Sequence, residues 1–86
     1  MQAGIVSITI PNGSSTSNIL TVTFPQAFGD IPLVFVSLVN NNGYLGDQLY
    51  TRDATATNVG IVANRESIDT AGDDVLSAAW LAIGPE

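Results

Sequence analysis

One arginine next to an aspartate is the pair of side chains in this sequence best suited to binding chemistry. Arg52 and Asp53 are adjacent, and Arg52 is one of only two basic residues among 86. A guanidinium donates hydrogen bonds and a carboxylate accepts them, and charge-assisted bonds are about twice as strong as neutral ones. The pair is therefore a candidate for holding the hydroxyl groups of a sugar. The alternative is an ordinary ion pair at a subunit boundary.

Aromatic side chains offer a second kind of contact, because the face of a ring can stack on the apolar face of a sugar. Tyr44 lies in the asparagine- and glycine-rich segment 40–46, and Tyr50 lies close to Arg52. For both tyrosines the alternative is packing, or display on the surface. Trp80 is surrounded by apolar residues, so we expect it in the core or in an interface rather than in a binding site.

Acidic residues gather in the segment 65–74, the most charged stretch of the chain. Asp69, Asp73 and Asp74 could together hold Ca²⁺, which takes about six to eight oxygen ligands. Their spacing does not match an EF-hand loop, so we interpret them as solvated loop carboxylates and predict no metal and no other cofactor. The chain has no histidine and no cysteine, and no serine lies in a G-x-S-x-G setting. We therefore do not expect an enzyme.

The charge balance excludes several kinds of partner. The net charge is −6 and there is no lysine, whereas nucleic acids and anionic membrane surfaces both require a basic surface. No apolar run reaches the roughly 18 residues needed to span a bilayer, so no membrane insertion is expected. A low content of charge with many hydroxyl side chains is typical of secreted or virion-surface proteins. We expect an extracellular protein or a virion component, either whole or as a fragment of a longer chain.

Alternation of apolar and polar residues predicts the elements that would position these side chains. Short alternating runs that end at Pro, Gly, Asn or Asp indicate β-strands, and no segment has helical periodicity. Phe28, in the connection 26–32, should close one end of the core. The sequence thus predicts a single all-β domain, residues 1–86, folded as a six-stranded antiparallel β-sandwich. The expected strands are Ile5–Ile10, Ile19–Phe24, Leu33–Val39, Gln48–Arg52, Asn58–Asn64 and Val75–Gly84.

Two of these strands are apolar on both faces. In the segment 75–84, Leu76, Ala78, Trp80 and Ala82 share one side, and the opposite side is also almost entirely apolar. The segment 33–39 has the same character. An antiparallel strand with one face in water should alternate, so both strands are expected to be covered a second time from outside the domain. Other copies of the same chain would supply that cover, and oligomerisation also suits a small domain without disulfides.

The residue pattern resembles the H-type lectins. The motif Val22-Thr23-Phe24-Pro25, then Phe28, then Ile31-Pro32-Leu33-Val34-Phe35-Val36-Ser37-Leu38, is similar to the first signature of that family. Asn58-Val59-Gly60-Ile61 and, after a loop, Ala79-Trp80-Leu81-Ala82-Ile83-Gly84 are similar to the second. The resemblance covers about Val22 to Gly84. Without cysteine or a signal peptide, the chain is most similar to the short domains of this kind at the C-terminal ends of bacteriophage tail and receptor-binding proteins.

The resemblance implies a six-stranded sandwich assembled as a parallel homotrimer, with a cell-surface glycan, often N-acetylgalactosamine, bound between protomers. Arg52 falls near the family's arginine position. The family's carboxylate-bearing first loop corresponds to 12–18, which offers Asn12, Ser14 and Asn18 instead, and Asp69 lies near the position of the family's histidine. The expected ligand-binding residues are Asn12, Ser14, Tyr44, Arg52, Asp53 and Asp69. A trimerisation cap for a fibre, with no ligand, is the alternative function.

Overall fold

The computed structural model describes residues 1–40, 48–65 and 72–85, and the chain in these ranges is all β. Among the described residues no helix is long and apolar enough to cross a membrane. The fold class and all six antiparallel strands predicted from the sequence are confirmed. The strands are β1 (Gln2–Ile10), β2 (Leu20–Thr23), β3 (Leu33–Asn40), β4 (Gln48–Arg52), β5 (Asn58–Asn64) and β6 (Asp74–Ile83).

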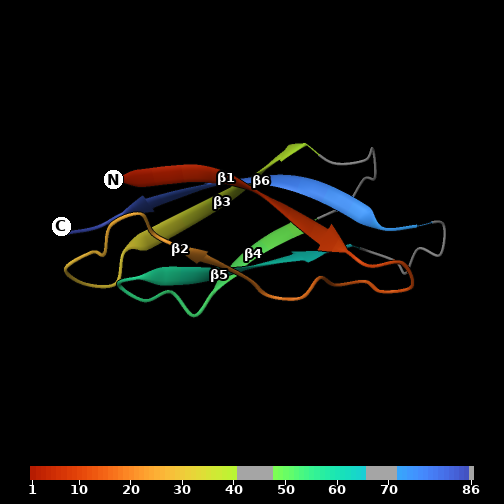
Figure 1. The fold of residues 1–86 in the computed structure, drawn as a ribbon, viewed down its shortest axis with the longest axis horizontal. Coiled ribbons are helices and arrows are strands. Elements are labelled where there is room, and N and C mark those ends of the chain that lie inside the picture. The colour runs from red at the N-terminus through yellow and green to blue at the C-terminus, as the bar shows by residue number, and fades with distance from the viewer. Residues whose placement is uncertain (41–47, 66–71, 86) are drawn as a thin grey trace.

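The strands form two three-stranded sheets that face each other across the core (Figure 1). The first sheet has the order β1-β6-β3 and the second has the order β2-β5-β4. The molecule is elongated, with extents of 44 × 19 × 17 Å. Both termini lie at one end of it, and the loop that joins β1 to β2 lies at the other end (Figure 1).

Alternation along the strands fills the space between the sheets. In β6, Leu76, Ala78, Trp80 and Ala82, which the sequence placed on one side of the strand, point inward and are buried. Larger side chains close the end near the termini: the rings of Phe24 and Phe28 meet edge to face at 5.1 Å between centroids, and Phe24 lies 5.6 Å from the Trp80 ring. Phe28 therefore closes the core as expected. The other buried apolar residues are Ile8, Ile10, Val22, Val59, Ile61 and Ala63.

Strand ends differ from the expectations where pairing, rather than residue type, decides them. The first strand begins at Gln2, three residues before the predicted Ile5. Ala3 and Gly4 have little strand propensity of their own, but they pair with Leu81 and Trp80 on β6. The last strand begins at Asp74 and ends at Ile83, one residue earlier at each end than predicted, and Asp74 pairs with Ile10.

The outward side of the β1–β6–β3 sheet is apolar over the half nearest the termini. Adjacent positions across the three strands form rows: Ala3, Leu81 and Phe35 make one, and Ile5, Ala79 and Ser37 make the next. Ile5 and Leu33 are each 68% exposed and Phe35 is 56% exposed. We call this surface the outer apolar face; its residues are Ala3, Ile5, Leu33, Phe35, Ala79, Leu81 and Ile83.

Gly4 is required where Trp80 packs across β1. A Cβ atom at Gly4 would lie 2.7 Å from the indole Nε1 and 2.9 Å from Cε2, closer than real contacts allow. We therefore expect Gly4→Ala to destabilise the fold by about 1–3 kcal/mol, even though alanine is normally preferred to glycine in a strand. Urea unfolding followed by the fluorescence of Trp80, the only tryptophan, measures this effect. Thr9→Ser, an exposed position of the same strand outside the outer apolar face, is the control, and a Gly4→Ala variant as stable as this control would contradict the assignment.

Candidate functional site

The predicted site residues lie at two different ends of the second sheet. Arg52 pairs with Gly60 at one end of β5, whereas Asn64, at the other end, pairs with Gln48 and bridges to Thr16. Four residues of strand separate these ends, or about 13 Å. Asn12 and Ser14 belong to the Thr16 end, so within one copy they do not join Arg52 and Asp53. The predicted site residues Tyr44 and Asp69 lie outside the described residues.

Gly60 leaves the room in which the Arg52 side chain lies across the second sheet. β4 is an edge strand, and Arg52 lies opposite Gly60 on its neighbour β5. A Cβ at Gly60 would lie 3.2 Å from Cγ of Arg52 and 2.9 Å from Cγ2 of Ile19. The arginine stem and the isoleucine therefore both lie against the space that a larger residue would fill. Gly60 thus positions Arg52 beside an apolar side chain, a neighbour that the sequence analysis did not single out.

Asp53 turns back onto Arg52 through an uncommon backbone conformation. Its φ is +54°, in the left-handed region that aspartate and asparagine tolerate better than most residues. Arg52 Nε donates to Asp53 Oδ2 at 3.2 Å, and the two side chains are 55% and 80% exposed. A solvent-exposed pair of this kind contributes about 0–1 kcal/mol to stability. The ion pair therefore stabilises the fold too little to explain the left-handed conformation of Asp53. Residues in such conformations are found more often at binding sites.

The turn that follows Asp53 is fixed by its own hydrogen bonds. Thr55 N–H donates to the Asn58 carbonyl at 2.8 Å, and Thr55 Oγ1 accepts from the N–H groups of Thr57 and Asn58. Two backbone bonds tie the turn to the core: Phe24 N–H donates to the Thr57 carbonyl and Phe28 N–H to that of Ala56. The Arg52–Asp53 pair therefore stands on a rigid support.

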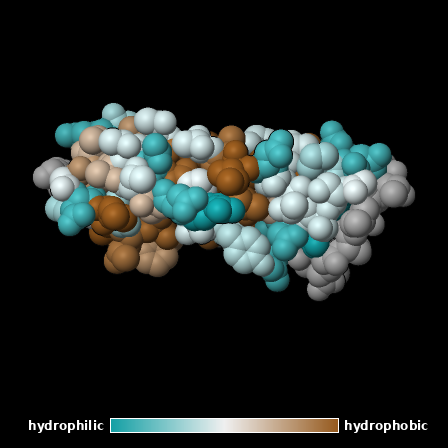
Figure 2. All heavy atoms as spheres, turned by 90° about the horizontal axis from the view of Figure 1, so that it is seen from below, coloured by the Kyte–Doolittle hydropathy of each residue, from teal (hydrophilic) through white to brown (hydrophobic). Residues whose placement is uncertain are grey.

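Tyr50 completes an exposed group along this edge. Tyr50 and Arg52 are two residues apart on β4, so they project from the same face, about 7 Å apart. Tyr50 is about half exposed, and its hydroxyl donates to Gln48 Oε1. We call Ile19, Tyr50, Arg52 and Asp53 the β4 edge site. Figure 2 views the molecule from below relative to Figure 1, the side of β2 and β5, and shows apolar residues next to hydrophilic ones on this surface.

The β4 edge site keeps hydrogen-bonding groups that the fold does not use. Among the described residues, Nη1 and Nη2 of Arg52 have no acceptor, and Oδ1 of Asp53 has no donor. The site thus presents N–H donors next to a carboxylate acceptor, beside the Tyr50 ring. This combination suits a ligand whose hydroxyl groups both donate and accept.

The loop 11–18, by contrast, uses its predicted ligand groups internally. Asn12 N–H donates to Asp73 Oδ1 at 2.9 Å, and Asn12 Oδ1 accepts from Gly72 N–H at 3.2 Å. The Ser14 hydroxyl donates to the Thr16 carbonyl at 2.9 Å and accepts from Thr16 N–H. These contacts hold the loop against the start of β6. Asn12 and Ser14 therefore have a structural role in the single copy.

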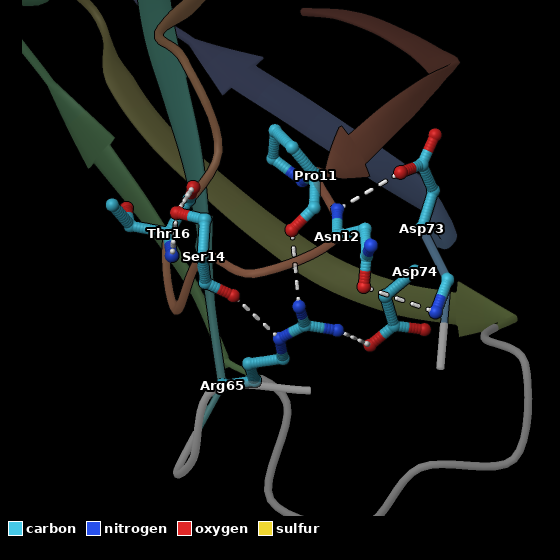
Figure 3. Close-up of polar contacts among 8 residues, drawn as sticks. Pro11, Asn12, Ser14, Thr16, Arg65, Asp73 and Asp74 are labelled. Carbon is cyan, nitrogen blue, oxygen red and sulfur yellow. Dashed lines mark hydrogen bonds and ion pairs between the residues drawn. The ribbon is translucent and has the colours of Figure 1, made fainter. Parts of the chain in front are cut away.

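Arg65 and Asp74, which the sequence analysis placed in a charged, solvated loop, are buried. Figure 3 shows the Arg65 guanidinium pointing into the loop 11–14, where Nε donates to the Ser14 carbonyl at 2.8 Å and Nη2 to that of Pro11 at 3.0 Å. Nη1 lies 4.0 Å from Oδ2 of Asp74, a residue with no exposed surface. The interpretation of Asp74 as a solvated carboxylate is wrong: the end of β5, the loop and the start of β6 enclose it.

Two of the three carboxylates considered for Ca²⁺, Asp73 and Asp74, already face other groups in the structure. Asp73 already accepts from Asn12, and a guanidinium faces Asp74 (Figure 3). A cation next to Asp74 would be repelled by Arg65. The third carboxylate of the proposed cluster, Asp69, lies outside the described residues.

A shallow depression of about 220 Å³ lies on the first sheet rather than at the β4 edge site. Its wall includes Phe35, Ser37, Ala79 and Leu81, which face outward from β3 and β6. Its lining contains no charged side chain and one hydroxyl group, that of Ser37. A ligand there would therefore be bound mainly by apolar contact rather than by hydrogen bonds. The depression forms part of the outer apolar face and is better suited to an apolar side chain than to a sugar.

The position of the β4 edge site follows from the topology. β4 is the edge of the second sheet, and it is in contact with β3, the edge of the first. Arg52 and Tyr50 project from the outward side of the second sheet, whereas the outer apolar face is the outward side of the first, so the two surfaces approach each other only where β4 contacts β3. Comparison with known proteins adds no relative: no family model, curated protein or solved structure matches this chain.

Proposed function

We propose that this protein is a carbohydrate-binding, receptor-recognition module that acts as a homotrimer, as the distal domain of a phage tail or fibre protein. The observation that carries the proposal is the β4 edge site. It places on one edge a half-exposed tyrosine ring together with guanidinium donors and a carboxylate oxygen that have no partner in the part of the chain that the structure describes. Its ligand would be a glycan of the host cell surface, in keeping with the resemblance to H-type lectins.

The outer apolar face supports assembly with copies of the same chain. The three strands of the first sheet contain one charged residue, Asp74, and it is buried. Chains with a net charge of −6 repel each other, but they can meet at this face without bringing carboxylates together. Isolated apolar residues are common on protein surfaces, whereas contiguous patches mark interaction sites.

β3 carries part of the outer apolar face and contacts β4, so a copy docked on this face and extending past β3 would approach the β4 edge site from the border of the two sheets. A glycan bound there would then contact two copies at once. A single site of this open kind binds at about millimolar Kd, or roughly −4 kcal/mol. Three such sites on one trimer would raise avidity by about 10²-fold or more without new contacts.

The second candidate function is a trimerisation cap that registers a fibre and binds nothing. The internal use of Asn12 and Ser14 favours it, because the loop that should carry ligand groups is instead part of the fold. Both candidates require the homotrimer. They differ only in whether the β4 edge site binds a glycan.

A glycan array probed with the assembled protein, with Arg52→Ala as the test variant, separates the two functions. We expect the wild type to bind a restricted set of glycans and Arg52→Ala to lose at least about tenfold in affinity, because charged hydrogen bonds contribute about 1.5–3 kcal/mol each. Thr51→Ala, the exposed neighbour that projects from the other face of β4, is the control. If the wild type binds no glycan at millimolar concentration, and Arg52→Ala changes neither adsorption nor binding, the carbohydrate-binding function is wrong and the cap is the candidate that is left.

A further inference from the structure

The β4 edge site contains the only exposed basic side chain of the protein. The sequence has two arginines and no lysine, and Arg65 is buried. An anionic ligand would therefore have to bind at Arg52 or meet no basic side chain at all. How Arg52 is paired decides whether the protein accepts anionic glycans.

We propose, resting on the proposed function above, that Asp53 restricts the β4 edge site to uncharged sugars. Glycans whose terminal residue carries a carboxylate, such as sialic or uronic acids, would be bound more weakly than their neutral counterparts. Asp53 is then the specificity-determining residue, and Arg52 is the donor that both kinds of ligand would need.

The geometry of the pair gives the physical reason. Asp53 Oδ2 occupies the Nε–H of Arg52 at 3.2 Å, so one edge of the guanidinium is closed to a ligand carboxylate. A carboxylate bound to the remaining Nη donors would lie within a few ångströms of Asp53, which is 80% exposed and stands in a chain of net charge −6. Like charges at about 4–6 Å disfavour each other, and nothing else on this edge compensates.

A neutral sugar gains from the same arrangement. A hydroxyl donates one hydrogen bond and accepts others, so two neighbouring hydroxyls can accept from the Nη groups of Arg52 and donate to Oδ1 of Asp53. Neither of those atoms has a partner among the described residues. The carboxylate thus attracts one class of ligand and repels the other, which is how binding sites acquire specificity.

The resting structure already places the Asp53 carboxylate against Arg52. The backbone at Asp53 has a left-handed φ of +54° and leads into the hydrogen-bonded turn around Thr55, and the carboxylate accepts from Arg52 Nε at 3.2 Å. A pre-positioned carboxylate does not have to move away when a ligand arrives. Discrimination therefore follows from the resting structure and requires no conformational change.

Matched sugar pairs that differ only at C6 test the proposal: galactose with galacturonic acid, glucose with glucuronic acid, and mannose with mannuronic acid. Ligand-observed NMR titration at millimolar concentration gives both affinities of a pair. In the wild type we expect the neutral member of the bound pair to be favoured about tenfold or more. The preference should fall as the salt concentration rises, because the repulsion is screened over about 8 Å at physiological ionic strength.

The variant Asp53→Asn removes the charge and keeps a residue that tolerates positive φ. We expect its preference for the neutral sugar to fall to about threefold or less, with the acidic member gaining affinity. Asp30→Asn, an equal change of charge at another exposed aspartate, should leave the ratio unaltered. Asp53→Gly, which adopts the same φ without a carboxylate, repeats the test if the asparagine variant is misfolded by circular dichroism.

Each outcome is decisive, and the two levels of the proposal can fail separately. If the wild type binds neither member of any pair, the carbohydrate-binding function fails. If it binds the acidic member as well as or better than the neutral one, the selectivity fails while the function stands. A neutral preference that survives unchanged in both Asp53 variants also overturns the role of Asp53.

Discussion

Asp74→Ala is expected to lower the free energy of unfolding by about 3–5 kcal/mol. The substitution leaves the Arg65 guanidinium buried, without the carboxylate that lies 4.0 Å from it. The guanidinium keeps its hydrogen bonds to the carbonyls of Pro11 and Ser14, but the nearby negative charge that offsets part of its desolvation is lost, which is why breaking one half of a buried pair is damaging. For a domain of this size the change corresponds to a fall in Tm of at least about 12 °C.

The neighbouring residue provides a matched control. Asp73→Ala removes the same charge one residue away, but Asp73 is exposed and only accepts a hydrogen bond from Asn12, so its loss should cost about 1 kcal/mol. Thermal unfolding of both variants at one fixed protein concentration gives the comparison, since the stability of an oligomer depends on concentration. Equal Tm values for the two variants would show that the buried pair does not stabilise the fold.

The reciprocal change, Arg65→Met, separates packing from charge. Methionine fills part of the volume, but the Ser14 carbonyl loses the Arg65 donor, the Pro11 carbonyl keeps only the Ser14 N–H, and Asp74 is left buried without a cation. We expect a loss of about 3–5 kcal/mol again. The double variant Arg65→Met, Asp74→Leu should be more stable than Arg65→Met alone, because no buried charge remains. A double variant less stable than Arg65→Met would contradict this account.

Most of the fold could be predicted because burial and strand alternation have the same period. Val59 and Ile61 are fully buried on β5, as alternation indicated. On β6, which is apolar on both faces, alternation could not say that Leu76 and Trp80 would face the core. The start of β1 could not be predicted, since its first residues become a strand only by pairing with β6. Local residue types carry no information about that long-range partner.

The charged residues show where sequence reasoning ends. Arg65 and Asp74 stand in the most charged stretch of the chain, and charge runs are normally solvated, so nothing local distinguishes them from Asp73. Their burial depends on the loop 11–14 folding over them, a contact more than fifty residues away along the chain. The pairing of Arg52 with Asp53 could be predicted because the residues are adjacent. The left-handed φ that aims one at the other could not.

Phe35→Asp on the outer apolar face is expected to convert the assembled protein to monomers. Phe35 is 56% exposed on the edge strand β3 and lies in one row with Leu81 and Ala3 across the surface proposed to contact other copies. A carboxylate there would be buried without a partner in each interface. The cost is several kcal/mol per carboxylate, enough to reverse a modest association.

Sedimentation velocity at micromolar concentration measures the change directly: the wild type should sediment as a trimer and Phe35→Asp as a monomer. Thr23→Asp introduces the same charge on the exposed side of β2, in the second sheet, and should leave the trimer intact. The fold of one copy should survive, because Phe35 points away from the core, and Trp80 fluorescence verifies this. The monomeric variant should still bind glycan at its single β4 edge site, but only through the contacts that one copy supplies. A Phe35→Asp variant that is still a trimer would show that the copies do not meet at this face. A monomeric wild type would show that the outer apolar face is exposed to solvent in the native protein. Either result would refute assembly through this face.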